Sequence, residues 1–168
     1  MELKKRISEE VEKLLNERIK GEYQSAYIYW AMSNWCDCYG FFKAKDKYRK
    51  YGDEEISHAR KLEDYINDRN GKVVLQVIPV PQQEFKSLLD VITKSYEHEQ
   101  VVTDNYTKLA SAIFNTDKVT FAELQWFVTE QIEEEAKFAD AIIFANRLGI
   151  TDETTGVELA ELEDFLTK

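Results

Sequence analysis

Residues 72–84 read KVVLQVIPVPQQE, and this stretch decides the fold because it is a long break in a sequence of otherwise helical spacing. It contains both prolines, Pro79 and Pro81, beside an apolar run from Val73 to Ile78. Proline interrupts a helix because it lacks an N–H donor and clashes with the preceding turn. Elsewhere, apolar residues recur three and four positions apart, which predicts helices over about residues 4–38, 42–69, 85–114, 120–148 and 155–166.

The lengths of the connections predict how these helices are arranged. Short turns separate the first helix from the second and the third from the fourth, so each pair is expected to form an antiparallel hairpin. Residues 72–84 can span about 43 Å when extended, and a helix of about 28 residues is about 42 Å long. We therefore predict one all-α domain over residues 1–168, a four-helix bundle with a long crossover between the second and third helices and a short fifth helix.

The charge of the chain limits its partners. It carries 32 acidic and 22 basic residues, which gives a formal net charge of −10. Such a surface favours cations and repels phosphate backbones, so nucleic acid is not expected as a partner. No apolar run approaches the roughly 20 residues that span a bilayer. The N-terminal residues lack the apolar core of a signal peptide. We expect a cytoplasmic protein with no membrane partner.

Polar residues interrupt the apolar face of each long predicted helix near its middle. A bundle helix turns residues spaced three and four apart towards the core. On these faces the interruptions are Glu22 in the first helix, Glu55 and His58 in the second, Glu99 in the third, and Gln131 and Glu134 in the fourth. A single such Glu is commonly a residue at the solvated edge of a helix. Interruptions at matching depth in four helices instead predict one shared polar site.

Four carboxylates inside a bundle require positive charge. Burying even one costs several kcal/mol, and four would rival the roughly 5–15 kcal/mol that stabilise a whole domain. Arg18 is the only cationic residue expected on these faces, one turn from Glu22. Two divalent cations would balance four carboxylates, and oxygen ligands with one imidazole suit iron or manganese. Glu55 and His58 lie three residues apart, so they can share a metal, and Glu55 could bridge two ions.

Four segments give the chain a resemblance to the bacterial non-haem ferritins, within the ferritin-like di-iron carboxylate superfamily. They are residues 21–36 (GEYQSAYIYWAMSNWC), 54–58 (EEISH), 96–100 (YEHEQ) and 124–135 (LQWFVTEQIEEE). An isolated Glu-x-x-His is a weak signal, whereas all four segments in this order around a long crossover are specific. The resemblance covers nearly the whole chain and implies a ferritin-like bundle.

The resemblance also implies roles for individual residues. A first iron would be bound by Glu22, Glu55 and His58. A second would be bound by Glu55, Glu99 and Glu134, with Gln131 alongside. A third, transient iron site would lie at Glu54, Glu130, Glu133 and Glu134. Tyr29 matches a tyrosine that supplies an electron, and Trp126 matches a neighbouring tryptophan, although core packing explains both aromatic residues equally well.

By the same resemblance, the chain is expected to be a ferroxidase that oxidises Fe(II) with O2 or peroxide. It would store the product as a ferric oxyhydroxide mineral inside a hollow homo-oligomer of 24 subunits. The crossover would lie at a two-fold contact and the fifth helix at a four-fold axis. The fifth helix is too short to be stable alone, so its apolar face needs a partner, and self-association could supply one.

Departures from related patterns exclude other members of the superfamily. Gln131-x-x-Glu134 stands where bacterioferritins and ribonucleotide reductase-like enzymes have a second Glu-x-x-His. Ile56 stands where bacterioferritins have a haem-binding methionine, so no haem is expected. Mini-ferritins that protect DNA build their site between subunits and lack a fifth helix of this kind.

Two further alternatives remain open. One is a rubrerythrin-like or other di-iron oxidase or peroxidase without mineral storage. Rubrerythrins usually carry an iron module with four cysteine ligands, which the two cysteines of this chain, Cys36 and Cys38, cannot build. These cysteines also lack the second ligand pair of a zinc site, so reduced thiols near the end of the first helix are expected. The other alternative is a structural shell subunit, which would have lost the ligands that this chain retains.

Overall fold

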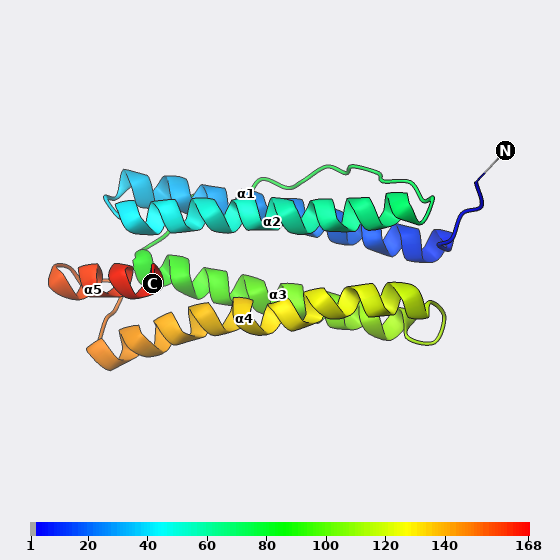
Figure 1. Cartoon of the computed structure of the whole chain (residues 1–168). Coiled ribbons are helices and arrows are strands. Elements are labelled where there is room, and N and C mark those ends of the chain that lie inside the picture. The colour runs from blue at the N-terminus through cyan, green and yellow to red at the C-terminus, as the bar shows by residue number, and fades with distance from the viewer. Residues whose placement is uncertain (1–2) are drawn as a thin grey trace.

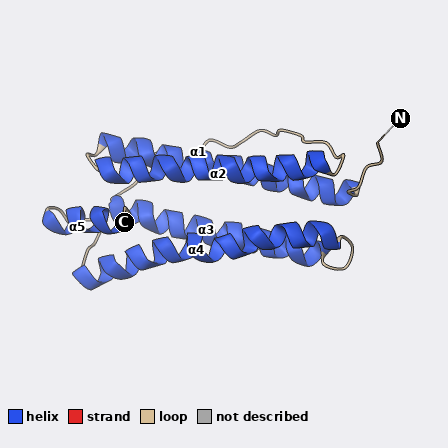
Figure 2. Ribbon diagram, in the orientation of Figure 1, coloured by secondary structure: helices blue, strands red, loops and turns tan. Residues whose placement is uncertain are grey.

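The computed structural model describes residues 3–168, and in this range it consists of five helices and no strand. The helices are α1 (Glu9–Cys38), α2 (Phe42–Asp68), α3 (Leu88–Ile113), α4 (Lys118–Leu148) and α5 (Val157–Leu166). Helices α1 and α2 form one antiparallel hairpin, α3 and α4 form the other, and α5 lies at one end of the bundle (Figure 1; Figure 2). The predicted all-α class is confirmed.

The long crossover between α2 and α3 runs back along the outside of the α1–α2 hairpin (Figure 1). Asn16 of α1 holds its first residues: its Nδ2 donates to the carbonyl oxygen of Lys72 at 3.0 Å, and its Oδ1 accepts from the N–H of Val74 at 2.6 Å. Glu12 accepts from the N–H of Lys72 at 2.7 Å. Side-chain amides and carboxylates therefore satisfy backbone groups that no helix or strand satisfies.

Two helices begin later than predicted because a serine caps each of them. Helix α1 begins at Glu9 rather than residue 4, since Oγ of Ser8 accepts from the N–H of Val11 at 3.2 Å. Helix α3 begins at Leu88 rather than residue 85, since Oγ of Ser87 accepts an N–H in its first turn at 3.0 Å. Serine is favoured at this position because its hydroxyl satisfies a free N–H of the first turn.

The other boundary differences are smaller. Helix α4 begins at Lys118 rather than residue 120, because the carboxylate of Asp117 accepts from the N–H of Thr120 at 3.0 Å. Helix α5 begins at Val157 rather than residue 155, after Gly156 with a φ of 92°. Helices α2 and α3 each end one residue earlier than predicted. Within residues 3–168, none of the helices combines the length and the apolar character that crossing a bilayer requires.

Apolar side chains form two buried clusters, one towards each end of the bundle. The first contains Tyr29, Tyr51, Ile92 and Phe138 among others. The second contains Ile19, Leu62, Val102 and Phe127 among others. In each long helix, the polar residues singled out in the sequence lie between the segment that enters one cluster and the segment that enters the other. The core is therefore apolar at its two ends and polar in its middle.

Helix α5 docks on its own subunit. Leu162 and Leu166 are buried, and the ring of Phe165 stacks on Phe144 of α4 with centroids 4.4 Å apart. Helix α2 has no side-chain cap of its own, and Glu163 of α5 accepts from two N–H groups of its first turn at 2.8 and 3.0 Å. The partner that the apolar face of α5 requires is thus supplied in part within the same chain.

Helices α1 and α2 approach each other closely at Gly52. A Cβ at this position would lie 2.3 Å from Nε1 of Trp30 and 3.1 Å from the backbone oxygen of Ala26. We expect Gly52→Ala to destabilise the protein by about 1–3 kcal/mol in thermal or chemical unfolding, because overpacking outweighs the better helix propensity of alanine. In the Trp30→Ala background the clash with the ring is absent, so the two substitutions should be clearly non-additive. Additive effects would contradict this explanation.

Candidate metal centre

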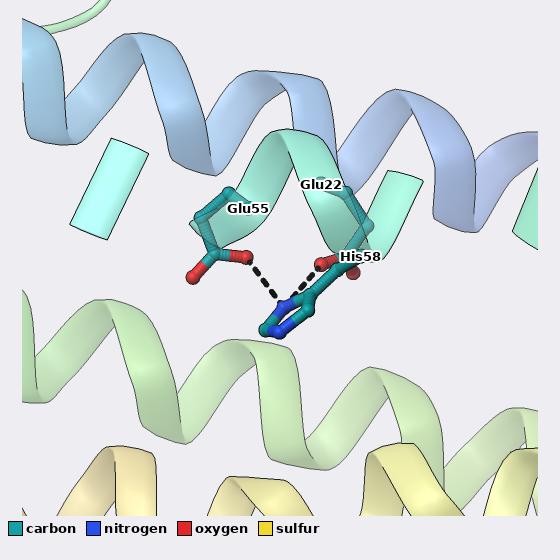
Figure 3. Close-up of side chains that lie close together, drawn as sticks. All are labelled: Glu22, Glu55 and His58. Carbon is teal, nitrogen blue, oxygen red and sulfur yellow. Dashed lines mark hydrogen bonds and ion pairs between the residues drawn. The ribbon is translucent and has the colours of Figure 1, made fainter. Parts of the chain in front are cut away.

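Three of the predicted residues meet between α1 and α2. Nδ1 of His58 lies 3.2 Å from Oε2 of Glu55 and 3.6 Å from Oε2 of Glu22, and all three side chains are buried (Figure 3). Glu55 and His58 share a face of α2 because they lie three residues apart. Glu22 faces them from α1. One atom from each residue lies within 4.8 Å of the others, the spacing that a shared metal ion requires.

A second group of buried ligands lies beside the first and shares Glu55 with it. Glu55 of α2, Glu99 of α3 and Glu134 of α4 each bring a carboxylate oxygen within 4.8 Å of the other two. Together the two groups draw on all four long helices. A carboxylate has two oxygens, so Glu55 can contact two cations at once.

Neighbouring side chains orient these carboxylates. The hydroxyl of Tyr106 donates to Oε1 of Glu22 at 2.7 Å. Nε2 of Gln131 donates to Oε2 of Glu99 at 2.9 Å, and the hydroxyl of Tyr29 donates to the other oxygen of Glu99. Such partners fix the orientation of metal ligands. The structure therefore brings Gln131 and Tyr29 to the site as hydrogen-bond donors to one of its carboxylates.

Arg18 brings positive charge to the edge of the first group. Its Nη2 lies 3.9 Å from Oε1 of Glu22, and its guanidinium carbon lies 5.0 Å from the ring centroid of Tyr106. The guanidinium reaches this position because Gly21 has no side chain: a Cβ there would lie 1.8 Å from Nη2. Gly21, part of the motif quoted above, thus makes room for a buried cation.

A second cation was not anticipated from the sequence. Lys137 forms an ion pair with Glu134, three residues earlier on α4, and its ammonium group lies 3.9 Å from the ring centroid of Tyr51. The spacing of three residues was the available signal, because it places the two side chains on one face of the helix. Arg18 thus lies at the first ligand group of the centre, and Lys137 lies at the second.

Residues 12–143 match the family model of the ferritin-like domain. The chain belongs to the ferritin family. It is 44% identical over 133 residues to the bacterial non-heme ferritin of Campylobacter jejuni, covering 79% of this chain and 80% of the relative. It is 36% identical over 159 residues to the bacterial non-heme ferritin of Staphylococcus saprophyticus, covering 94% and 93%. The resemblance stated from the sequence is confirmed.

Solved ferritin structures match nearly the whole fold. The open-pore ferritin of the archaeon Archaeoglobus fulgidus superposes with a TM-score of 0.88 at 33% identity, covering 96% of this chain and 98% of that chain. An engineered closed form of the same ferritin gives 0.89 at 33% identity, covering 96% of each. The predicted ferritin-like class, including the crossover and the fifth helix, is confirmed for this family member.

The residues predicted for a third iron site are not gathered in this ferritin chain. Glu54 and Glu133 are exposed and Glu130 is half-buried, whereas Glu134 is buried in the second ligand group. Over residues 3–168, neither group of metal-competent ligands includes Glu54, Glu130 or Glu133. A third site at these residues would need their side chains to move and stays a prediction.

Trp126 borders the centre but is not a core residue. Its side chain is 40% exposed, its ring centroid lies 5.4 Å from that of His58, and the ammonium group of Lys61 lies 4.6 Å from the centroid. The indole therefore shields the imidazole from solvent on one side.

Burial raises the pKa of two carboxyl groups in this ferritin centre. For Glu55, burial and the nearby charges of Glu22 and Glu99 raise the pKa well above its ordinary value, although its contact with His58 opposes this. Burial also raises the pKa of Glu99 to about 7, against the effect of its two hydrogen-bond donors. A carboxyl group without a bound cation loses hydration on burial, so its neutral form is favoured.

For His58 and Glu22, neighbouring groups outweigh the effect of burial on the pKa. Burial lowers the pKa of His58, but the adjacent carboxylates of Glu22 and Glu55 raise it to about 10. Burial opposes ionisation of Glu22, yet contacts with His58, Arg18 and Tyr106 hold its pKa below its ordinary value. Without metal, the centre therefore keeps a proton on His58 and on the carboxyl groups with raised pKa values.

Metal binding must release these protons, because an imidazole nitrogen and a carboxylate oxygen bind metal only when deprotonated. We expect the apparent affinity for Mn2+ to fall at least about tenfold for each pH unit between pH 8 and pH 6. The dependence should be steeper below pH 7, where Glu99 also holds a proton. Calorimetry in two buffers of different protonation enthalpy measures the protons released. Binding without proton release would contradict the assigned protonation of His58.

Proposed function

We propose that this ferritin-family chain is a ferroxidase that oxidises Fe(II) to Fe(III) and stores the product. The observation that carries the proposal is the pair of buried ligand groups that share Glu55 and draw on four helices. Fe(II) is the substrate, and its oxygen and imidazole ligands here are those that iron accepts. The first Fe(II) would bind Glu22, Glu55 and His58, and the second Glu55, Glu99 and Glu134.

The proposed reaction takes one electron from each of two Fe(II) ions. With O2 as oxidant, two electrons and two protons give hydrogen peroxide, and hydrogen peroxide itself could accept two electrons and two protons to give two waters. The protein contributes by holding both ions at one bridging carboxylate and by providing negative charge that stabilises Fe(III). Gln131 contributes a neutral amide beside Glu99 instead of a fifth carboxylate, which leaves the second ion less tightly held for release into storage.

In this proposal Tyr29 supplies a further electron: two electrons from the first pair of Fe(II) ions, one from a third Fe(II) and one from Tyr29 reduce O2, with four protons, to two waters. Burial and the charge of Glu99 raise the pKa of Tyr29 well above its ordinary value, so the phenol keeps its proton. An electron leaving the ring could be accompanied by transfer of that proton along its hydrogen bond to Glu99. This role is part of the proposal and rests on the contact between these two residues.

Storage would require the cytoplasmic homo-oligomer of 24 subunits that the family resemblance implies. Apolar residues of the crossover support such self-association, since Leu75, Val77 and Val80 are 72%, 88% and 83% exposed on the single chain. Exposed patches of large apolar side chains commonly mark protein–protein contacts, and in this proposal a second copy of the chain covers this one. Neither haem nor another resident cofactor is part of the proposal.

Two measurements test the proposal. Fe(II) is added under air and the near-ultraviolet absorbance of Fe(III) is followed; rapid oxidation should saturate at two Fe(II) per subunit. The mass of the particle in solution is then measured, with the iron that stays bound to it. Oxidation no faster than in buffer would refute the ferroxidase assignment. Rapid oxidation by a monomer that retains no iron would instead favour a di-iron oxidase without mineral storage.

A further inference from the structure

Lys137 occupies a specific position at the second ligand group. Its side chain is 25% exposed, its ammonium group pairs with the buried carboxylate of Glu134, and the ring of Tyr51 lies 3.9 Å beneath the ammonium nitrogen. A solvated surface lysine makes neither a buried ion pair nor a contact with the face of a buried aromatic ring. The ammonium group therefore contacts side chains of two elements, Glu134 of α4 and Tyr51 of α2.

The carboxylate that Lys137 neutralises is one that the second metal ion needs. Glu134 has a side chain only 9% exposed, and its Oε2 accepts no hydrogen bond from residues 3–168, although the ammonium group lies against it. No other donor reaches this oxygen within residues 3–168, so the ammonium group of Lys137 is what compensates it. A divalent cation entering the group of Glu55, Glu99 and Glu134 would be repelled by the positive ammonium group of Lys137, which lies against Glu134.

Arg18, at the first ligand group, is held differently. Its side chain is 10% exposed, its guanidinium lies over Tyr106, and it stays 3.9 Å from Glu22. Lys137 is more exposed, lies directly against its carboxylate and has a flexible four-carbon stem. The guanidinium of Arg18 is therefore held in place at the edge of the first ligand group. The ammonium group of Lys137, at the second ligand group, can rotate away from its carboxylate.

We propose that Lys137 is a displaceable internal cation that occupies Glu134 until the second metal ion expels it, and that it thereby weakens the second metal position relative to the first. This inference rests on the proposed function, because it concerns the same ligand groups. It assigns Lys137 as a positioning residue that sets how readily the second ion binds and leaves. The residue acts through Glu134 and takes no part in electron transfer.

The test is anaerobic titration with Mn2+, which prefers carboxylate and imidazole ligands to thiols. Calorimetry gives the affinity of each step, and electron paramagnetic resonance distinguishes an isolated Mn2+ from a coupled pair. In Lys137→Met, whose side chain keeps the apolar contact with Tyr51, we expect the second step to tighten about tenfold. The first step should be unchanged. Lys137→Arg, which keeps the charge, should keep the weak second step.

Lys47→Met is the matched control, because the ammonium group of Lys47 lies 5.5 Å from the centroid of the same Tyr51 ring but pairs with no carboxylate within residues 3–168. It should titrate like the wild type. Equal affinities of the second step in Lys137→Met and the wild type would overturn the inference, as would equal tightening by Lys47→Met. Glu55→Ala separates the two proposals: if it titrates like the wild type, the proposed metal centre itself is wrong.

Discussion

Replacing Glu55 by alanine is expected to slow Fe(II) oxidation by more than about 100-fold. Loss of an outer residue that only orients a ligand commonly costs about 10–100-fold, and Glu55 is the one carboxylate shared by both ligand groups. Its removal takes a ligand from each position and leaves the two ions without a common bridge. The initial rate of the near-ultraviolet absorbance change after addition of Fe(II) under air measures the effect.

Asp53→Ala is the matched control, because Asp53 is an exposed acidic residue two positions earlier on α2. It removes an acidic side chain from the same helix without touching the centre and should keep the wild-type rate. The metal-free Glu55→Ala protein should remain folded, since the substitution removes a buried carboxyl group whose ionisation burial disfavours. A folded Glu55→Ala variant with the wild-type rate would show that oxidation occurs elsewhere.

The topology could be predicted from the sequence because it depends on lengths. A helix rises by a fixed amount for each residue, so the crossover of about 13 residues could be compared directly with the length of a helix. The mid-helix polar positions could be predicted because helical spacing fixes which residues share a face. Both inferences use only backbone geometry, which is the same in every protein.

Features that depend on side-chain conformation were not predictable. Lys137 lies against Glu134 rather than in solvent because the ring of Tyr51, from another helix, provides a surface for it. The starts of α1 and α3 depend on serine caps, which compete with the helical spacing that continues before them. Spacing placed Glu55 and Glu134 on the core-facing sides of their helices, but it could not show that their oxygens lie 4.8 Å or less apart or that Glu54 and Glu133, their neighbours in sequence, are exposed.

In the metal-free protein, raising the pH from 5 to 8 is expected to cost the wild type about 2–3 kcal/mol more folding stability than it costs Glu99→Gln. Burial raises the folded-state pKa of Glu99 to about 7, above that of an unfolded chain. A group with a raised pKa contributes stability at pH values below its unfolded pKa, and this contribution is lost as the pH rises through the folded pKa. Glutamine imitates the protonated carboxyl group at every pH, so the variant avoids this loss.

Chemical unfolding in the presence of a chelator, at one protein concentration and at pH 5, 6, 7 and 8, measures the difference. Glu97→Gln is the control, because Glu97 lies on the same helix as an exposed partner of Lys94 and should change stability by less than about 1 kcal/mol at any pH. Added Mn2+ should reverse the order: the wild type gains stability from the metal, whereas Glu99→Gln has lost a ligand and gains less.

The reversal follows from a single cause. The same burial that makes the Glu99 carboxylate unfavourable without metal makes it a strong ligand when a divalent cation replaces its proton. A stability difference that stays constant from pH 5 to pH 8 would mean that Glu99 keeps an ordinary pKa and is well solvated. The buried acidic groups would then need no cation to compensate them, and the physical reason for placing iron among them would be lost.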